Sequence, residues 1–342
     1  VEFIWGGSSY STTDCCFHDT LTKNGSGRYL LTALDGSTML FDANGMPDVF
    51  TDANGNADDY TYNASLQCTG WTSSCGLSTT IGHDLNNWVS SMTIDGIWTY
   101  TFSVDSTGKL VSITSPTTPD QSSGIVIAPQ YNGSGDLTAV RDGNGNDPYT
   151  YSYTAGKVTT ATGSTITFSY NTNRTDVTDR NGNVIRYHYS GRDVTKVEQW
   201  ISGAAAFATN YTYSGGDLIK VVKPRGNRID FTVNGNGQVT ERRQKETDTN
   251  SNSASDIVES WAYTSNFVTS YTDPRGYTTT YTRDAAGNVT AINYPTVTSP
   301  TTQSSVSKSF TYNARGQKTQ ATDEEGKIVE YAYYASGSNK YG

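Results

Sequence analysis

The sequence predicts an all-β fold: a long antiparallel strip of hairpins that coils into a barrel-like or hollow shell. Three observations predict it. Aromatic and polar side chains alternate with a period of two in many short segments. Turn-forming sequences rich in Asp, Asn and Gly follow those segments at intervals of about 20 residues. The chain of 342 residues is only 34% hydrophobic and contains 24 Tyr, so it lacks the Leu and Ala of helical cores, and we expect almost no helix.

The segment 277–294 shows the repeated unit. Tyr277, Thr279 and Tyr281 share one parity, which is the pattern of a pleated strand. The sequence Asp-Ala-Ala-Gly-Asn at 284–288 then interrupts the alternation. Asp caps a turn with its side chain, and Gly adopts positive φ without strain. The segment therefore predicts a strand, a type I turn with a bulge, and a second strand.

The same unit recurs along the chain, with an aromatic residue before each turn. These residues are Phe41, Tyr62, Phe102, Tyr131, Tyr153, Tyr170, Tyr189, Tyr213, Phe231, Tyr263, Tyr281 and Tyr312. Long polar insertions lengthen two of the connections, at 245–256 and 295–308. One continuous array of hairpins predicts one domain. About 24–30 strands spaced ~4.8 Å apart form a strip on the order of 130 Å long, which strand twist forces to coil or close.

Three segments carry a recognisable motif: VTDRNGNVIRYHY at 177–189, YTDPRGYTTTYTRD at 271–284 and YTRDAAGNVTAI at 281–292. Through them the chain resembles the tyrosine-aspartate (YD) repeat proteins of the Rhs, teneurin and toxin-complex shell family, over most of 29–334. The resemblance implies that the hairpins join edge to edge into a strip that winds into a hollow shell. In toxin-bearing members the shell encloses a C-terminal toxic domain, but this sequence shows no recognisable toxin or autoprotease segment.

The repeat boundaries suggest the domain organisation. We expect residues 1–28 to form an N-terminal segment that contains Cys15 and Cys16, and residues 29–342 to form a single YD-repeat β-shell. A Cys-bearing loop at 63–80 should adorn the N-terminal end of this shell. We expect the two insertions to plug or cap the ends of the strip, and the lumen to be small or filled by side chains.

All four cysteines lie in the first quarter of the chain: Cys15, Cys16, Cys68 and Cys75. The spacing does not suit zinc, because there is no C-x2-C pair. We expect two disulfides, with the adjacent Cys15 and Cys16 each pairing to one of the other two, although the sequence leaves the connectivity open. Disulfides imply an oxidising compartment, so the expected location is extracellular, at the cell surface or periplasmic.

The charge and hydropathy exclude several classes of partner. The formal net charge is −9, which argues against binding to nucleic acid and to an anionic membrane surface. No run of 18 apolar residues is present, so we expect no membrane insertion. The remaining expected partner is an unknown protein or carbohydrate.

One acidic turn is a weak candidate for calcium. Asp52, Asn54, Asn56 and Asp58 place short oxygen ligands at every second position, as a calcium loop does. However, Gly falls at the fourth position instead of the sixth, and no Glu closes the loop. Ordinary turn chemistry explains the same residues. We therefore expect no cofactor, with calcium at this turn as the alternative.

No motif indicates catalysis. The histidines His18, His83 and His188 lack a matching nucleophile, and G-x-S-x-G is absent. Any pair of carboxylates for glycoside hydrolysis would be an arbitrary choice among 33 acidic residues. We therefore assign no catalytic residue and expect a protein that is not an enzyme.

Two functions remain. The first is a non-enzymatic extracellular structural or binding module, for adhesion or for carbohydrate or protein binding. Its candidate ligand platform is aromatic: Trp71, Trp88, Trp98, Trp200 and Trp261. The alternative is an encapsulating shell for a toxic cargo that is supplied separately. The lack of a visible cargo domain after the repeats favours the first.

Overall fold

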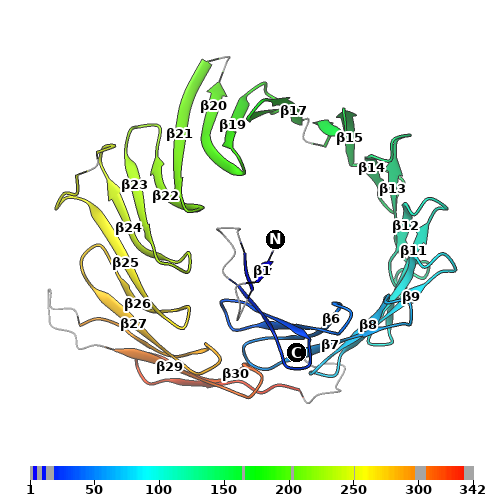
Figure 1. Cartoon of the computed structure of the whole chain (residues 1–342), viewed down its shortest axis with the longest axis horizontal. Coiled ribbons are helices and arrows are strands. Elements are labelled where there is room, and N and C mark those ends of the chain that lie inside the picture. The colour runs from blue at the N-terminus through cyan, green and yellow to red at the C-terminus, as the bar shows by residue number, and fades with distance from the viewer. Residues whose placement is uncertain are drawn as a thin grey trace. The chain divides into compact units, whose positions relative to one another are not determined.

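The computed structural model describes residues 3–5, 10–12, 19–163, 166–201, 204–249, 251–296 and 306–334. In this part of the chain, 31 strands and no helix are present (Figure 1). The predicted all-β fold is therefore confirmed.

Contacts divide the chain into two compact units. Unit 1 contains residues 1–60, 73–76 and 211–342, and unit 2 contains residues 61–72 and 77–210. The boundary that we predicted between residues 28 and 29 does not separate the units, because both residues lie in unit 1.

The strands of unit 1 are short. They are β1 (Phe3–Trp5), β2 (Tyr10–Thr12), β3 (Thr20–Lys23), β4 (Tyr29–Thr32), β5 (Thr38–Phe41), β6 (Pro47–Thr51), β7 (Ala57–Tyr62), which ends in unit 2, β22 (Asp217–Val222), β23 (Arg228–Val233), β24 (Val239–Lys245), β25 (Ile257–Thr264), β26 (Phe267–Thr272), β27 (Thr278–Arg283), β28 (Val289–Asn293), β29 (Ser307–Tyr312), β30 (Lys318–Thr322) and β31 (Ile328–Glu330). From β1 to β7, and again from β22 to β31, each strand pairs antiparallel with its predecessor.

Unit 2 follows the same plan. Its strands are β8 (Cys68–Ser73), β9 (Ser78–His83), β10 (Val89–Ile94), β11 (Trp98–Val104), β12 (Leu110–Thr114), β13 (Val126–Tyr131), β14 (Leu137–Arg141), β15 (Tyr149–Thr154), β16 (Lys157–Ala161), β17 (Ile166–Asn171), β18 (Arg174–Thr178), β19 (Val184–Ser190), β20 (Asp193–Ile201) and β21 (Ala204–Ser214), which ends in unit 1. From β9 to β21, each strand pairs antiparallel with the strand before it. The predicted strip of antiparallel hairpins is thus confirmed within each unit.

The turn between β27 and β28 shows why this sequence forms a hairpin. The backbone N–H of Asp284 donates to the carbonyl of Asn288 at 3.0 Å, and the N–H of Gly287 donates to the carbonyl of Asp284 at 3.1 Å. One carboxylate oxygen of Asp284 accepts the N–H groups of Ala286 and Asn288. Gly287 has φ +87°, and the register shifts beside Arg283. The predicted turn with its bulge is confirmed.

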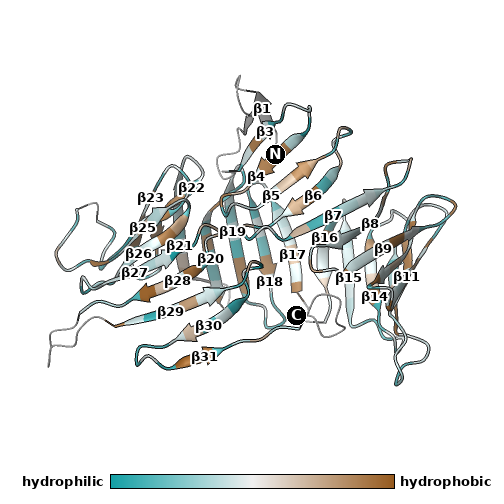
Figure 2. Cartoon of the chain, turned by 90° about the horizontal axis from the view of Figure 1, so that it is seen from below, coloured by the Kyte–Doolittle hydropathy of each residue, from teal (hydrophilic) through white to brown (hydrophobic). Residues whose placement is uncertain are grey.

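The sheet has no packed core. Among the described residues other than glycine, only Ala139, Ile229, Thr79 and Lys245 are buried as whole residues, and no large side chain is fully buried. Hydrophobic and hydrophilic residues are mixed along the strands (Figure 2). Both faces of the sheet are therefore partly exposed within each unit, and the expected small or filled lumen stays a prediction.

Two predicted segments differ from expectation. The Cys-bearing segment 63–80, predicted as a loop, contains β8 and the start of β9, because its residues alternate as other strands do. Within the predicted N-terminal segment, β3 already pairs with β4. The predicted insertion at 245–256 falls between β24 and β25, except that Lys245 is the last residue of β24. Most of the other insertion lies outside the described residues.

Candidate functional site

The tyrosine before a turn links one hairpin to the hairpin that precedes it. Four tyrosine hydroxyls donate to the backbone carbonyl of the first residue in the preceding hairpin's second strand. The bonds, of 2.7 or 2.8 Å, are Tyr153 to Leu137, Tyr263 to Val239, Tyr312 to Val289 and Tyr333 to Lys318. Burial raises the pKa of Tyr263 and of Tyr312. Sequence reasoning placed Tyr153, Tyr263 and Tyr312 before turns but did not identify Tyr333. It also missed the hydrogen bond, which the preference for Tyr over Phe at these positions could have indicated.

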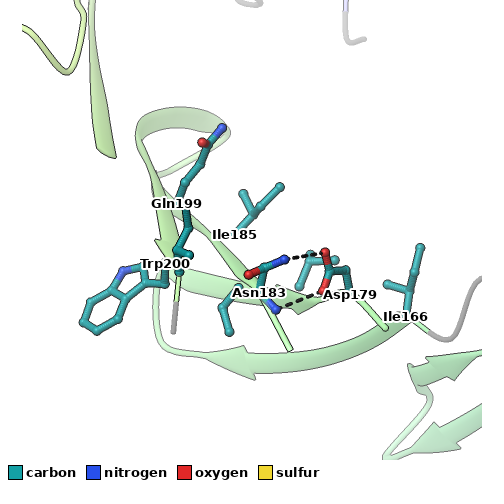
Figure 3. Close-up of a pocket in the computed structure, with 9 residues that line it drawn as sticks. Ile166, Asp179, Asn183, Ile185, Gln199 and Trp200 are labelled. Carbon is teal, nitrogen blue, oxygen red and sulfur yellow. Dashed lines mark hydrogen bonds between the residues drawn. The ribbon is translucent and has the colours of Figure 1, made fainter. Parts of the chain in front are cut away.

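The best-formed hollow lies in unit 2 and has a volume of about 520 Å³. It lies where β17, β18, β19 and β20 meet the turn between β18 and β19 (Figure 3). Its lining is mostly aliphatic: Ile166, Val177, Val184, Ile185 and Ile201, with Asp179, Asn183, Gln199 and Trp200 as the polar and aromatic members. This hollow is open and apolar, and it suits contact with another surface.

The acid in this hollow is not available as a base. The carboxylate of Asp179 accepts the side-chain amide of Asn183 at 3.1 Å and the backbone N–H groups of Asn181 and Asn183. These hydrogen bonds, led by that from the Asn183 side chain, lower the pKa of Asp179. Asp179 therefore holds the turn together as a carboxylate.

A charged ladder crosses β18, β19 and β20, with Asp176, Arg186 and Glu198 opposite one another. Asp176 forms ion pairs with Arg174 at 2.8 Å and with Arg186 at 3.4 Å. The Arg186 guanidinium stacks on the ring of Trp200, with its Cζ 3.6 Å from the ring centroid. Opposite charges pair across three strands, although Arg174 Nε, Asp176 Oδ1 and Arg186 Nε are buried without a hydrogen bond. The ladder contributes cross-strand contacts to the sheet.

The ladder continues to a histidine. Glu198 forms ion pairs with Lys196 and with His188, whose Nε2 lies 3.0 Å from the carboxylate. The hydrogen bond from Lys196, followed by the bond from His188, lowers the pKa of Glu198 to about 2 against the cost of burial. His188 thus lies against a carboxylate and a lysine, an arrangement without a nucleophile.

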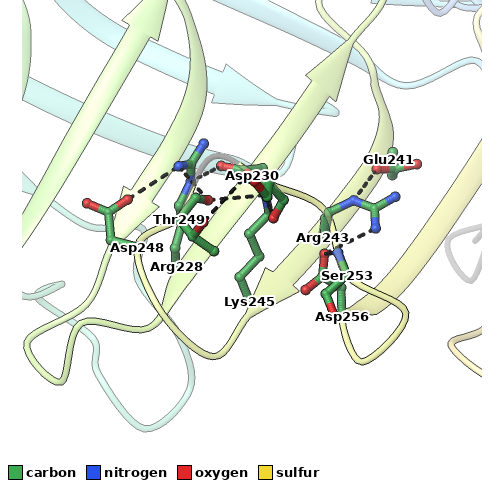
Figure 4. A network of polar contacts seen from close by, with 10 residues as sticks. Arg228, Asp230, Glu241, Arg243, Lys245, Asp248, Thr249, Ser253 and Asp256 are labelled. Atoms are coloured by element: carbon green, nitrogen blue, oxygen red, sulfur yellow. Dashed lines mark hydrogen bonds and ion pairs between the residues drawn. The ribbon is translucent and has the colours of Figure 1, made fainter.

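The insertion between β24 and β25 is fixed by a buried cation (Figure 4). The side chain of Lys245 is 1% exposed, and its Nζ lies 3.3 Å from a carboxylate oxygen of Asp230. The same ammonium donates to the carbonyls of Thr249 at 3.3 Å and Ser251 at 3.1 Å. Beside it, Arg228 donates to the Thr249 carbonyl at 3.0 Å. The start of the insertion is therefore folded back onto its own hairpin.

A second ion pair holds the end of the insertion. Arg243 lies 3.3 Å from the carboxylate of Asp256, whose side chain is 5% exposed. Asp256 also accepts the backbone N–H of Ser253 at 3.0 Å. The hydrogen bond from Ser253, followed by that from Arg243, lowers the pKa of Asp256. Side-chain contacts thus hold the insertion near both of its ends.

The predicted calcium turn makes ordinary turn contacts. Asp52 accepts the backbone N–H groups of Asn54 and Asn56 and the Asn56 side-chain amide. Asp58 lies in β7, opposite Phe50. Over the described ranges, no group of three or more acidic, His or Cys side chains is placed to hold a metal ion. Calcium binding here stays a prediction, and the ion would have to replace these hydrogen bonds.

The predicted aromatic platform is distributed over several strands. Trp71, Trp98, Trp200 and Trp261 lie in β8, β11, β20 and β25, and Trp88 lies just before β10. Trp261 packs against Tyr271 with ring centroids 5.5 Å apart. Trp88 and Trp98 are 43% and 46% exposed. The Arg186 guanidinium stacks on the Trp200 ring, so one face of this ring is already occupied.

The cysteine prediction is not tested. Cys68 and Cys75 form no disulfide with each other. The Cys68 thiol lies 3.6 Å from the Gly70 carbonyl. Cys15 and Cys16, their predicted partners, lie outside the described residues, as does His18.

No helix in the described ranges is long and apolar enough to cross a membrane. His83, the remaining histidine considered in the sequence analysis, is the last residue of β9 and lies opposite Val89 in β10.

Comparison with known proteins identifies a repeat and a fold. Residues 264–299 match the RHS Repeat family, which confirms the predicted resemblance for the motifs at 271–284 and 281–292. No curated protein matches the chain.

Several solved structures share the fold. The crystal structure of TcdB2-TccC3 matches with a TM-score of 0.62 at 13% identity, over 93% of this chain and 19% of that chain. That of TcdB2-TccC3-Cdc42 matches with a TM-score of 0.61 at 13% identity, over 91% and 18%. The Tc holotoxin pore of Photorhabdus luminescens matches with a TM-score of 0.60 at 13% identity, over 90% and 18%. The chain thus spans about a fifth of the length of the chains that it matches.

Proposed function

We propose that this chain, which carries an RHS repeat and has the fold of toxin-complex shell proteins, is a non-enzymatic wall segment of a larger β-shell. The wall encloses a polypeptide cargo that is supplied separately. The matched structures favour this function over the adhesion module, because TcdB2-TccC3 and TcdB2-TccC3-Cdc42 are assemblies of several proteins.

The observation that carries the proposal is the exposed area. The chain exposes 20847 Å², whereas a compact monomer of this size exposes about 13,600 Å². The excess arises because the sheet is one layer thick and neither face is covered by a second layer. A wall between two spaces needs two such faces, whereas an independent domain buries one of them.

The polar groups support a structural role. The strongest carboxylate clusters hold turns or cross-strand ladders, as Asp179 and Glu198 do. None of these acids lies beside a nucleophile that it could activate, within the part of the chain described. The proposed location, outside the cytoplasm, follows from the proposed role in a toxin-like assembly.

Small-angle X-ray scattering of the purified chain tests the wall. A compact domain of this length has a radius of gyration of about 20 Å. We expect a larger value, because a single-layer sheet spreads the same mass over more area. A radius near the compact value would overturn the proposal.

Photo-cross-linking tests the enclosed cargo. Val126 and Ile127 are exposed neighbours on β13, and the side chains of successive strand residues point to opposite faces of a sheet. A photoreactive residue is placed at one position or the other, in the assembly purified from its native host. Cross-links to a second polypeptide are expected from one position only, since only one face of a wall meets cargo. Cross-links from both positions, or from neither, would contradict enclosure.

A further inference from the structure

A turn near the start of unit 1 contacts two turns near the end of the chain. The turn at 52–56 joins β6 to β7. The side-chain amide of Asn288, in the turn between β27 and β28, donates to the Asn54 side-chain oxygen at 2.6 Å. The side-chain amide of Asn56 donates at 3.1 Å to the carbonyl of Arg315, in the turn between β29 and β30. The two bonds join residues 234 and 259 positions apart.

Two further contacts complete the arrangement. The guanidinium of Arg315 donates to the carbonyl of Ser74 at 3.2 Å. Gly316 leaves room for Asn54, since a Cβ added to Gly316 would lie 2.5 Å from the Asn54 Cγ. The turns therefore fit together by shape as well as by hydrogen bonds.

The turn sequence alone does not produce this contact. The turns at 142–146 and 179–183 carry Asn at the same position as Asn56. There, Asn146 and Asn183 donate to the Asp of their own turn and to no other described residue. The extra bonds of Asn54, Asn56 and Asn288 arise because unit 1 brings distant hairpins together.

These turn contacts connect the two parts of unit 1. Within the described residues, no strand of β1 to β7 pairs with a strand of β22 to β31. A few partly exposed hydrogen bonds contribute far less net stability than a strand ladder. The contact should therefore separate before any hairpin unfolds.

We propose that the turns at 52–56, 284–288 and 313–317 form a latch that closes unit 1 and opens reversibly while the hairpins stay folded. When the latch opens, the two parts of unit 1 separate while the strands within each part stay paired. The latch is independent of what the wall encloses and of whether it encloses anything.

Tryptic cleavage in the folded protein measures the latch. The bond after Arg315 lies inside the latch, since Asn56 holds its carbonyl. Arg275 occupies the same position in an unlatched turn, and its side chain is 79% exposed. We expect slower cleavage after Arg315 than after Arg275. In the double variant Asn54→Ala, Asn56→Ala, the ratio of the two rates should rise on the order of tenfold, the effect of losing two hydrogen bonds.

The matched control is Asn144→Ala, Asn146→Ala, which removes the same side chains from a turn of the same pattern without a distant partner. Its ratio should equal that of the unmodified protein. Asn54→Asp keeps the acceptor for Asn288 and should also keep the ratio. An unchanged ratio in the latch variant, or an equal rise in the control, would overturn the latch.

General destabilisation is recognised because it accelerates both cleavages. If the double variant loses its β-sheet circular dichroism, Asn54→Ala is compared with Asn144→Ala in the same assay. A ratio that rises only in Asn54→Ala supports the latch, and equal ratios refute it. Neither outcome depends on the scattering or cross-linking results that test the wall.

Discussion

At the scale of single residues, the tyrosine before a turn has two tasks. Its ring covers the neighbouring strand, and its hydroxyl satisfies a carbonyl of the preceding hairpin, as Tyr263 does for Val239. A phenylalanine would keep the ring contact and lose the hydrogen bond. The recurrence of Tyr in this repeat therefore has a physical cause beyond strand propensity.

Tyr263→Phe should lower the free energy of unfolding by about 1 kcal/mol, the net value of one hydrogen bond. Tyr281→Phe is the matched control, because Tyr281 also precedes a turn and its hydroxyl has no hydrogen-bond partner among the described residues. Urea unfolding of the two variants provides the measurement. Equal losses would show that the hydroxyl bond does not stabilise the repeat.

Glu198 makes stability depend on pH. Its pKa is about 2 in the folded protein and 4.5 ordinarily. The folded-state pKa is depressed, so its contribution is fully present above pH 4.5 and is lost as the pH falls toward 2. Lys196→Met removes the largest cause of the shift. The stability of this variant, measured by urea unfolding, should fall less steeply over that pH range than that of the unmodified protein, and an equal slope would contradict the assignment.

At the scale of elements, a glycine in a turn supplies the positive φ that the backbone needs and sometimes also the space, although Leu66 and Asn87 adopt positive φ in two other turns. Gly287 and Gly276 have φ of +87° and +84°. A Cβ on Gly287 would lie 2.3 Å from the ring of Phe267, whereas a Cβ on Gly276 would meet nothing within 4 Å. Substitution of Gly276 would therefore cause backbone strain alone, whereas substitution of Gly287 would cause backbone strain and a steric clash.

Gly276→Ala should cost about 1–2 kcal/mol through backbone strain alone. Gly287→Ala should cost at least about 1 kcal/mol more, because Phe267 must also move. Thermal unfolding of both variants measures the difference. Equal costs would mean that Phe267 gives way freely.

Elements were also the scale at which the sequence was most informative. The strands and turns depend on local rules, so the period of two and the turn at 284–288 were enough to place a hairpin. The anchoring of the insertion by Lys245 depends on where Asp230 lies in the neighbouring strand. The contact between Asn54 and Asn288 depends on how distant hairpins meet. Neither the Lys245 anchor nor the contact between Asn54 and Asn288 can be predicted from the neighbouring sequence.

At the scale of the whole molecule, a sheet without a packed core exposes less additional surface to water when it unfolds, because much of its surface is already exposed. Composition limits how much apolar surface the chain has, but it does not determine which face of a sheet buries that surface. Only Ala139 and Ile229 are buried apolar side chains among those described. Stability must come mainly from ladders between neighbouring strands.

The urea m-value should therefore be lower than that of a compact domain with the same number of residues, since m scales with the area exposed on unfolding. Equilibrium unfolding followed by circular dichroism gives the value. An m-value typical of a compact domain would show that one face of the sheet is covered in solution.

The tyrosine link also explains how this chain tolerates changes in length. The bonded residues are 15 or 16 positions apart in two hairpins, and 23 or 24 apart where an insertion intervenes. The bond is the same in each case, so the alignment of hairpins does not depend on loop length. Foreign sequence added within 246–256 should lengthen the loop without shifting the strands on either side. This connection is therefore a natural place to graft an epitope or a fluorescent reporter.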